Sequence, residues 1–225
     1  MNNRLDRIAL LIGQKSVQKL QQSTVMVVGC GAVGSFAIES LVRCGVGHLI
    51  LVDFDNVEES NINRQLFALD STVGMPKVDV AKKRIADINP DIVVDIYNTF
   101  FDENTKIDVM PDFVIDAIDT VQSKIALYKW CFANNVPFIS SMGAARKTDL
   151  TKIQIANISK TSVCPLASKI RRIKRDLNLP EFPVVFSSEN ATPQLNGGRE
   201  FGSIITVTGM FGLIMADFAI KKLIN

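Results

Sequence analysis

The stretch that decides the fold is residues 25–57, which read VMVVGCGAVGSFAIESLVRCGVGHLILVDFDNV. An apolar run leads into Gly29-x-Gly31-x-x-Gly34, a helix-patterned segment follows, and a second apolar run ends at Asp53. This order of strand, glycine turn, helix, strand and acid is the context in which the glycine motif indicates a nucleotide site. Gly29 permits the tight turn, Gly31 lets a phosphate approach the backbone, and Gly34 lets the helix pack against the strand.

The phosphates of a nucleotide at this motif would lie at the N-terminus of the following helix, where free N–H groups and the helix dipole favour anions. Asp53 is then placed to accept hydrogen bonds from a ribose. The motif alone leaves open which nucleotide is bound, because a dinucleotide oxidoreductase needs little beyond it.

Charged residues beyond the motif favour nucleotidyl or phosphoryl transfer. Asp53 is followed by a polar set: Asp55, Asn61, Arg64, Gln65 and Lys77. A second acid, Asp119, follows a third apolar run, and open parallel sheets bind ligands beyond the carboxyl ends of their strands. Arg64 and Lys77 are therefore predicted to face a phosphate chain, and Asp119 to hold Mg²⁺ or a substrate group. Such charges stabilise the transition state of phosphoryl transfer.

Six ordered motifs resemble the E1-like (ThiF/MoeB-type) adenylating superfamily, which includes activators of ubiquitin-like and sulfur-carrier proteins. They are residues 29–34 (GCGAVG), 53–57 (DFDNV), 61–65 (NINRQ), 73–77 (VGMPK), 88–90 (INP) and 116–119 (DAID). The resemblance implies that Asp53 holds the ATP ribose and that Asp119 holds magnesium. It implies phosphate contacts from Asn61, Arg64 and Lys77. The candidate catalytic residues are Arg64, Lys77 and Asp119, and the remaining candidate nucleotide contacts are Gly29, Gly31, Gly34, Asp55 and Gln65.

The second half of the chain resembles one branch of that superfamily, the tRNA threonylcarbamoyladenosine dehydratases. The motifs are residues 140–145 (SSMGAA), 149–154 (DLTKIQ), 158–160 (ISK), 165–169 (PLASK), 185–189 (VFSSE) and the segment from Gly202 onward. The resemblance implies an enzyme that uses ATP to adenylylate the carboxylate of a modified adenosine in tRNA and then cyclises that side chain. It implies ATP and Mg²⁺ as cofactors, and the chemistry requires no protein nucleophile.

The cysteines argue against a structural zinc, which the protein-activating bacterial members usually hold with two Cys-x-x-Cys pairs. The four cysteines of this chain, Cys30, Cys44, Cys131 and Cys164, form no such pair, and His48 is its one histidine. His48 is predicted to be structural. Some dehydratase members carry a cysteine where this chain has Val184, so a cysteine-dependent step at that position is ruled out, and Cys164 is predicted to be a buried or incidental thiol.

Two other functions stay open. One is an adenylyltransferase that activates the C-terminus of a ubiquitin-like sulfur-carrier protein, which the missing cysteine pairs disfavour. The other is a non-catalytic nucleotide- or NAD-binding module, which Arg64, Lys77 and Asp119 disfavour. A sulfur-transfer protein also stays open as a partner.

Composition agrees with a globular cytoplasmic protein. At 225 residues, 47% apolar and 21% charged, the chain can bury a sizeable core. The cysteines lack the spacing of a disulfide framework, and the polar start predicts no signal peptide, so a reducing cytoplasm is expected. The net charge of +2 does not by itself argue for nucleic acid, and no DNA partner is expected.

Residues 169–175 (KIRRIKR) carry five positive charges. Such a run is usually a solvated helix face, but with a tRNA substrate it becomes a candidate for contact with phosphates. The candidate tRNA-binding residues are Lys169, Arg171, Arg172, Lys174 and Arg175.

The alternation of elements predicts an α/β fold: a Rossmann-like, doubly wound, mainly parallel sheet with helices on both faces and an added C-terminal strand and helix portion. Strands are expected near 24–29, 48–53, 91–97, 112–116, 136–140, 151–156 and 184–187. Helices are expected near 5–20, 33–44, 61–69, 77–88, 121–134, 163–177 and 203–222. We expect one ATP-binding domain over residues 1–225, with a loose division near residue 145.

Two further segments carry expectations about assembly and location. Residues 201–220 are apolar enough to suggest a membrane-spanning helix. A buried C-terminal helix that packs on the sheet is the favoured interpretation. The N-terminal segment holds Arg4 and Arg7, and its resemblance to the superfamily's N-terminal helix implies a homodimer. Of the two, Arg7 rather than Arg4 matches the position of the superfamily's arginine that reaches the ATP of the neighbouring subunit.

Overall fold

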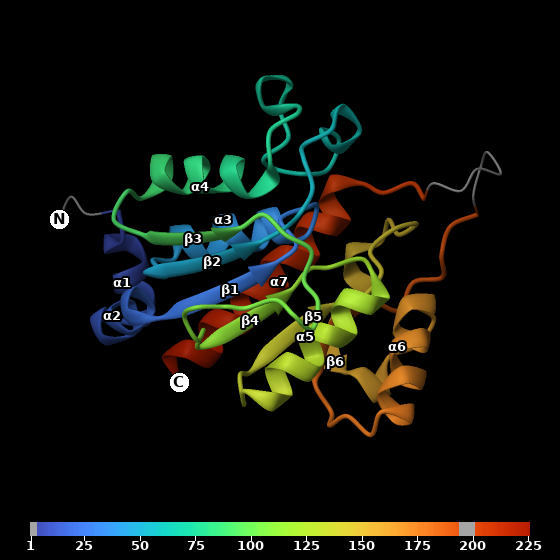
Figure 1. Ribbon diagram of the computed structural model, residues 1–225. Coiled ribbons are helices and arrows are strands. Elements are labelled where there is room, and N and C mark those ends of the chain that lie inside the picture. Colours follow the sequence, from blue (N-terminus) through green and yellow to red (C-terminus); the bar gives the residue numbers. More distant parts are fainter. Residues whose placement is uncertain (1–3, 194–200) are drawn as a thin grey trace.

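The computed structural model describes residues 4–193 and 201–225, and within these ranges seven strands form one sheet in the order β3-β2-β1-β4-β5-β7-β6 (Figure 1). The strand bounds are β1 (Thr24–Val28), β2 (His48–Val52), β3 (Val93–Tyr97), β4 (Phe113–Asp116), β5 (Phe138–Ser141), β6 (Ile153–Asn157) and β7 (Pro183–Ser187). Neighbouring strands are parallel except β6, which pairs with β7 in the antiparallel sense. The predicted mainly parallel sheet is confirmed.

Helices cover both faces of this sheet. Their bounds are α1 (Asp6–Ile12), α2 (Gln14–Gln22), α3 (Gly34–Arg43), α4 (Lys77–Ile88), α5 (Val121–Ala133), α6 (Pro165–Asp176) and α7 (Ile205–Ile224). Short 3₁₀ turns are η1 (Glu59–Asn61), η2 (Asp70–Thr72), η3 (Leu150–Lys152) and η4 (Ile158–Lys160). The core on one face takes its helical side chains from α2, α3, α4 and α7, and the core on the other face takes them from α5 and α6. The doubly wound arrangement is therefore confirmed.

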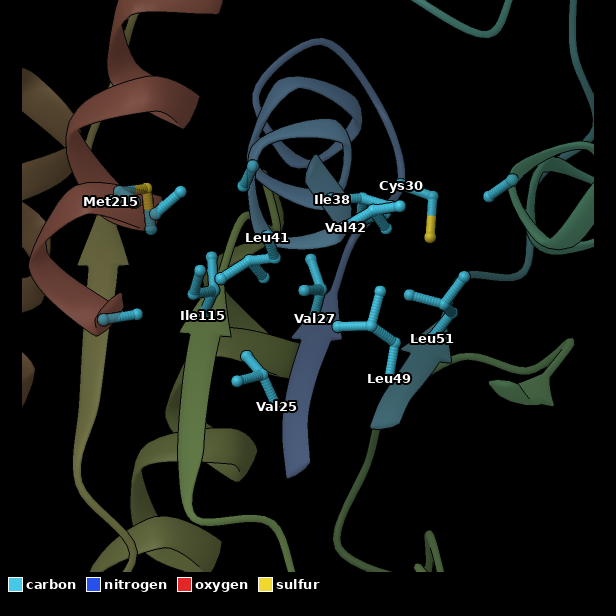
Figure 2. Close-up of a cluster of buried hydrophobic side chains, with 14 of the residues drawn as sticks. Val25, Val27, Cys30, Ile38, Leu41, Val42, Leu49, Leu51, Ile115 and Met215 are labelled. Carbon is cyan, nitrogen blue, oxygen red and sulfur yellow. The ribbon is translucent and has the colours of Figure 1, made fainter. Parts of the chain in front are cut away.

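The central strands are apolar on both faces because both faces are covered. Val25 and Val27 of β1 point into the core beneath α3 and α7, as Figure 2 shows with Leu41 and Met215 above them. Met26 of the same strand belongs to the core on the opposite face. This placement leaves the carboxyl ends of the strands, rather than either face, for polar chemistry.

Local signals set several helix ends where the sequence predicted them. Gly45 follows α3 with a φ of 89°, and the N–H of Val46 donates to the Leu41 carbonyl at 3.1 Å, which closes the helix. Pro76 precedes the first residue of α4, and Asn89 caps its last turn.

Helix α7 packs closely on α3, and its glycines permit that approach. A Cβ on Gly212 would overlap the carbonyl oxygen of Val33. Val207, Phe211 and Met215 of α7 are fully buried. The predicted buried terminal helix is therefore what the structure contains, and none of the helices in residues 4–193 and 201–225 combines the length and hydropathy that a membrane crossing requires.

Two predicted helices differ from the structure. The expected helix over 5–20 is split into α1 and α2, because Gly13 has a φ of 85°, outside the helical range. The expected helix over 61–69 is wrong: only the turn η1 forms near its start. There the side chain of Asn61 accepts from the Glu58 N–H at 3.2 Å, and such a bond to the backbone favours a turn over a helix.

Candidate nucleotide site

The glycine loop follows β1 and opens α3, and its glycines are required by close backbone contacts. Gly29 has a φ of 94°, and a Cβ there would lie 2.6 Å from the Ala117 carbonyl oxygen. A Cβ on Gly34 would overlap the carbonyl oxygen of Gly29. Any side chain at these two positions would therefore displace the loop from the strand ends. The free N–H groups of the first turn of α3 would move with it.

Asp53, which directly follows β2, is hydrogen-bonded to this loop. Its Oδ2 accepts from the N–H of Cys30 at 2.6 Å, and its Oδ1 accepts from the N–H of Asp55 at 2.9 Å. Burial raises the pKa of Asp53 above its usual value, by more than these two N–H groups and the charge of Lys77 lower it. The carboxylate therefore has a fixed orientation at the mouth of the loop, as a ribose acceptor requires.

A cavity of about 500 Å³ lies over the carboxyl ends of β1, β2, β4 and β5. Its lining brings together most of the predicted nucleotide contacts: Gly29, Gly31, Asp53, Asp55, Arg64, Gln65, Lys77 and Asp119. These residues come from separate loops, so the fold assembles them at one edge of the sheet, as parallel α/β sheets do for ligands. A hollow of about 590 Å³ at the opposite, amino-terminal ends of the strands is lined mostly by apolar residues and contains none of these residues.

The cations of the site are held in place by neighbouring oxygens. Lys77 is the first residue of α4 and is 7% exposed, and its Nζ lies 2.7 Å from the carboxylate of Asp55. The guanidinium of Arg64 donates to the Ser60 carbonyl and to Asn63 Oδ1, both at 2.7 Å. Two positive groups at one cavity wall suit a phosphate chain.

Two predicted contacts do not line the cavity. Gly34 lies beneath it, where it allows α3 to pack against the glycine loop. Asn61 is buried and caps the turn η1, with its Nδ2 donating to Ser60 Oγ at 3.3 Å. In this structure Asn61 shapes the segment that carries Arg64.

The cavity extends past the nucleotide residues to a wall that the sequence did not single out as a site. We call this the distal wall: Ser123, residues 141–147 and residues 164–166. Arg146 there has a φ of 61°, and its guanidinium donates to the Thr192 carbonyl at 2.6 and 2.8 Å. Lys147 is buried and donates to the carbonyl of Glu189. No periodicity or motif marks either cation as a pocket residue.

The sequence analysis also did not predict the exposed aromatic residues that line the cavity. Phe54 follows Asp53 and is 53% exposed, and its ring meets that of Phe100 edge to face, with centroids 5.0 Å apart. The two rings belong to loops that are distant in sequence, so only the fold brings them together. They add apolar surface of the kind that a nucleotide base packs on.

A buried polar network lies beneath the cavity floor, between β4, β5 and α5. Lys124 and Asp116 are both fully buried, with Nζ and Oδ2 2.7 Å apart. Ser140 donates to the same carboxylate oxygen at 2.5 Å and lies 2.6 Å from the Tyr128 hydroxyl. Lys124 Nζ also donates to the Ser141 carbonyl at 2.8 Å. The network ties the loop before α5, which carries Asp119, to the end of β5.

The thiols and the histidine do not form a nucleophile pair. All four cysteines are free, and the pKa of the Cys30 thiol is raised well above its usual value by burial and by the nearby charge of Asp53. Cys164 is buried, as predicted, although it lines the distal wall. Val184 lies within the core. His48 Nε2 pairs with Asp95 at 2.8 Å at the amino end of the sheet, which is the structural role that the sequence predicted.

Arg7 and the basic run lie outside the cavity. Arg7 is exposed on α1, and the guanidinium of Arg4 donates to the Ile88 carbonyl. In α6, Lys169, Arg172 and Arg175 are exposed. Arg172 also lies 4.0 Å from the carboxylate of Asp176, and both of these side chains are more than half exposed. The less exposed cations of the run have closer partners: Arg171 donates to the Thr161 carbonyl at 3.0 Å, and Lys174 pairs with Glu181 at 2.7 Å.

The mainly parallel sheet carries a glycine loop, an acid that is hydrogen-bonded to that loop, and cations at one cavity. This arrangement defines an α/β nucleotide-binding protein. The sequence pattern of the ThiF family matches residues 5–225, and the chain belongs to that family. A tRNA threonylcarbamoyladenosine dehydratase of Bacillus subtilis is 48% identical over 194 residues, which cover 84% of this chain and 76% of the relative. The tRNA threonylcarbamoyladenosine dehydratase of Haemophilus influenzae is 35% identical over a match that covers 99% of this chain and 94% of the relative. The predicted resemblance is confirmed.

Solved structures agree with the sequence relatives. The crystal structure of the Escherichia coli tRNA N6-threonylcarbamoyladenosine dehydratase in complex with AMP is 37% identical, covers 98% of this chain and 93% of its own, and has a TM-score of 0.92. The structure of the same enzyme in complex with ATP has a TM-score of 0.91 at 36% identity, with the same coverage.

Proposed function

We propose that this chain is an ATP-dependent tRNA threonylcarbamoyladenosine dehydratase. It adenylylates the carboxylate of the modified adenosine and cyclises that side chain. The observation that carries the proposal is the extent of the similarity: dehydratases match over both the nucleotide residues and the distal wall, up to 99% of this chain. Molybdopterin-synthase adenylyltransferase of H. influenzae matches over 130 residues, 57% of this chain. Activation of a carrier protein is therefore the weaker candidate.

The chemistry needs two displacements and no protein nucleophile. A carboxylate oxygen of the substrate first forms a bond to the α-phosphorus of ATP, the bond from that phosphorus to its bridging oxygen breaks, and pyrophosphate leaves. The carbamoyl nitrogen or oxygen then bonds to the activated carbonyl carbon, AMP leaves with the electron pair of the C–O bond, and one proton is lost. The cavity contributes positioning and charge: Arg64 and Lys77 are proposed to hold phosphates and Asp53 the ribose.

Mg²⁺ is the proposed companion of ATP, and Asp119 is its proposed protein ligand. The Asp119 carboxylate is exposed and lines the cavity at the end of β4. One or two carboxylates with phosphate oxygens and water are what Mg²⁺ usually takes. When bound, the ion would neutralise charge on the phosphates.

The direct test is mass spectrometry of tRNA nucleosides after incubation of modified tRNA with the protein and ATP. Threonylcarbamoyladenosine is expected to decrease in mass by one water molecule, and only when ATP is present. Thermal unfolding gives a second test, because a ligand that binds the folded state raises its stability. Stabilisation by ATP with Mg²⁺ but not by NAD is expected, and the reverse result would favour the NAD-binding module.

The exposed basic face of α6 is the proposed contact for the tRNA backbone. Its members are Lys169, Arg172 and Arg175, which lie at helical spacing, while Ile170 on the opposite side is fully buried. We expect alanine at all three positions to raise KM for tRNA. The slope of log affinity against log salt should become shallower by about 0.9 for each duplex phosphate that the variant no longer neutralises.

Three exposed lysines outside α6 provide the matched control: Lys82, Lys83 and Lys129. Their replacement by alanine removes the same charge and should change the salt dependence little. The affinity for ATP should stay the same in both triple variants. Equal salt slopes for the α6 variant and the wild type would show that the face is only solvated.

We further propose a homodimer in which Arg7 reaches the ATP of the neighbouring subunit. Arg7 is exposed and does not line the cavity of its own chain. The same helix exposes Leu10 (75%) and Leu11 (84%), apolar surface that an intersubunit contact would cover. We expect inactive Arg7→Ala and Arg64→Ala chains to regain activity when mixed, because a mixed dimer contains one intact site. A monomer in solution, or mixtures without activity, would contradict this arrangement.

We also propose a cytoplasmic location, which a tRNA substrate supports, and a sulfur-transfer protein as a partner, to be tested by co-purification. A single ATP-binding domain over residues 1–225 remains the proposed organisation. The division near residue 145 falls within the distal wall, so both halves of the chain contribute to one cavity.

A further inference from the structure

Two buried hydroxyl groups at the start of α5 have no hydrogen-bond partner. Among the described residues, the buried side-chain oxygen and nitrogen atoms in this state are Thr120 Oγ1 and Ser123 Oγ. Ser123 is 2% exposed, and both residues line the cavity. Buried polar atoms nearly always have a partner, so two orphaned hydroxyls at one cavity wall indicate a group that binds there.

The backbone of the same turn contributes further hydrogen-bond donors. Thr120 precedes the first residue of α5, yet its side chain does not cap the helix, as a threonine at this position usually does. The N–H of Lys124 is bonded to the Thr120 carbonyl at 3.1 Å, and the three N–H groups before it belong to the first turn, which has no acceptor within the helix. A 13-residue helix therefore presents its positive dipole end and two hydroxyl groups to the cavity.

We propose that the first turn of α5, with Ser123 Oγ and Thr120 Oγ1 as donors, is a second anion subsite that binds the carboxylate of the substrate for attack on the α-phosphorus. This inference rests on the proposed function. A carboxylate accepts several hydrogen bonds through its two oxygens. One oxygen would be held by these donors, while the other bonds to phosphorus as pyrophosphate leaves.

The position of the subsite favours the substrate carboxylate over a phosphate of the nucleotide. A hydrogen bond of 2.8 Å from Lys124 Nζ to the Ser141 carbonyl connects the first turn of α5 to the end of β5. Ser141 begins the longest segment of the distal wall. Arg64 and Lys77, the proposed phosphate contacts, come instead from the segments that follow β2. Asp119, the proposed Mg²⁺ ligand, directly precedes Thr120, so the subsite would lie beside the phosphates, where the carboxylate must attack.

The donors of the subsite are uncharged, which suits a carboxylate that must act as a nucleophile. The cations of the distal wall are already engaged: Lys147 with the Glu189 carbonyl and Arg146 with the Thr192 carbonyl. Lys124, beneath the subsite, is paired with Asp116. Neutral donors orient a carboxylate and withdraw less electron density from it than an ammonium or guanidinium would.

Ser123→Ala tests the subsite. A hydrogen bond to a charged group is worth a factor of about ten to a hundred, so kcat/KM for the modified tRNA should fall by that amount. The affinity for ATP with Mg²⁺, measured by calorimetry without tRNA, should not change. Ser40→Ala is the matched control, because Ser40 is also a helical serine, bonds within α3 to the Phe36 carbonyl and does not line the cavity. It should behave as the wild type.

Inhibition by free nucleosides identifies the group that binds. The wild type should bind threonylcarbamoyladenosine more tightly than its methyl ester, which lacks the negative charge, and this preference should be about tenfold or more smaller in Ser123→Ala, which keeps Thr120 and the N–H groups of the helix. A preference for the acid as large as that of the wild type would overturn the proposal. A fall in ATP affinity would assign the hydroxyl to a nucleotide phosphate and overturn it as well. If the wild type itself does not dehydrate the modified tRNA, it is the proposed function that fails.

Discussion

Exchange of Lys124 for methionine is expected to lower the free energy of unfolding by about 3–5 kcal/mol, which is the usual cost of leaving one member of a buried ion pair alone. Lys124 and Asp116 are both fully buried with their charged atoms 2.7 Å apart. Methionine fills a similar volume but leaves the Asp116 carboxylate with only neutral donors. Denaturation by urea, followed by circular dichroism, measures the change.

Two comparisons separate the buried charge from other effects of the exchange. Adding Asp116→Asn to Lys124→Met removes the unpaired charge, so the double variant should recover part of the lost stability. Lys221 pairs with Asp217 at the same 2.7 Å, but both side chains are more than half exposed. Lys221→Met should therefore cost only about 0.3–0.5 kcal/mol. Equal losses at Lys124 and Lys221 would contradict a stabilising role for burial of the pair.

This network also shows what the sequence could not reveal. Lys124 lies in a helix whose other residues follow no strong apolar stripe, and a helical lysine is ordinarily expected to be exposed. Its partners Asp116, Ser140 and Ser141 lie at the ends of two strands, and only the pairing of β4 with β5 brings them to it. Ser123, the residue before Lys124, could not be predicted for the same reason. In the sequence it resembles any polar helical residue, and only the fold places it at the cavity.

What could be predicted depends on chemistry that is local in the chain. Gly29 and Gly45 each have a positive φ that favours glycine, and Asp53 directly follows the second strand of one strand–helix–strand unit. The structure has the glycine loop, the strand end at Asp53 and the end of the helix near residue 44 at the predicted positions. The predicted helix over 61–69 does not form, because the side chain of Asn61 bonds to the backbone and favours a turn. The left-handed backbone at Arg146 has no sequence signal, since glycine or asparagine is the usual residue there.

Asp119→Ala is expected to lower the rate of ATP-dependent turnover by about a hundredfold to a thousandfold while the protein stays folded. Asp119 is exposed at the end of β4 and lines the cavity, so its loss removes no buried contact. Removal of a group that stabilises charge in the transition state costs about 3–4 kcal/mol, which corresponds to that loss of rate. The rate is measured by release of AMP with modified tRNA, and thermal unfolding without ligand should be unchanged.

The readouts must separate a role at the phosphates from a role in folding or in tRNA binding. Asp87→Ala is the matched control, since Asp87 is exposed on α4 and does not line the cavity. If Asp119 holds Mg²⁺, the stabilisation by ATP with Mg²⁺ should shrink in Asp119→Ala toward that given by ATP alone, whereas the control keeps the difference. KM for tRNA should stay near that of the wild type. A variant that turns over normally would remove Asp119 from the site, and one that loses tRNA affinity alone would move it from the phosphates to the substrate.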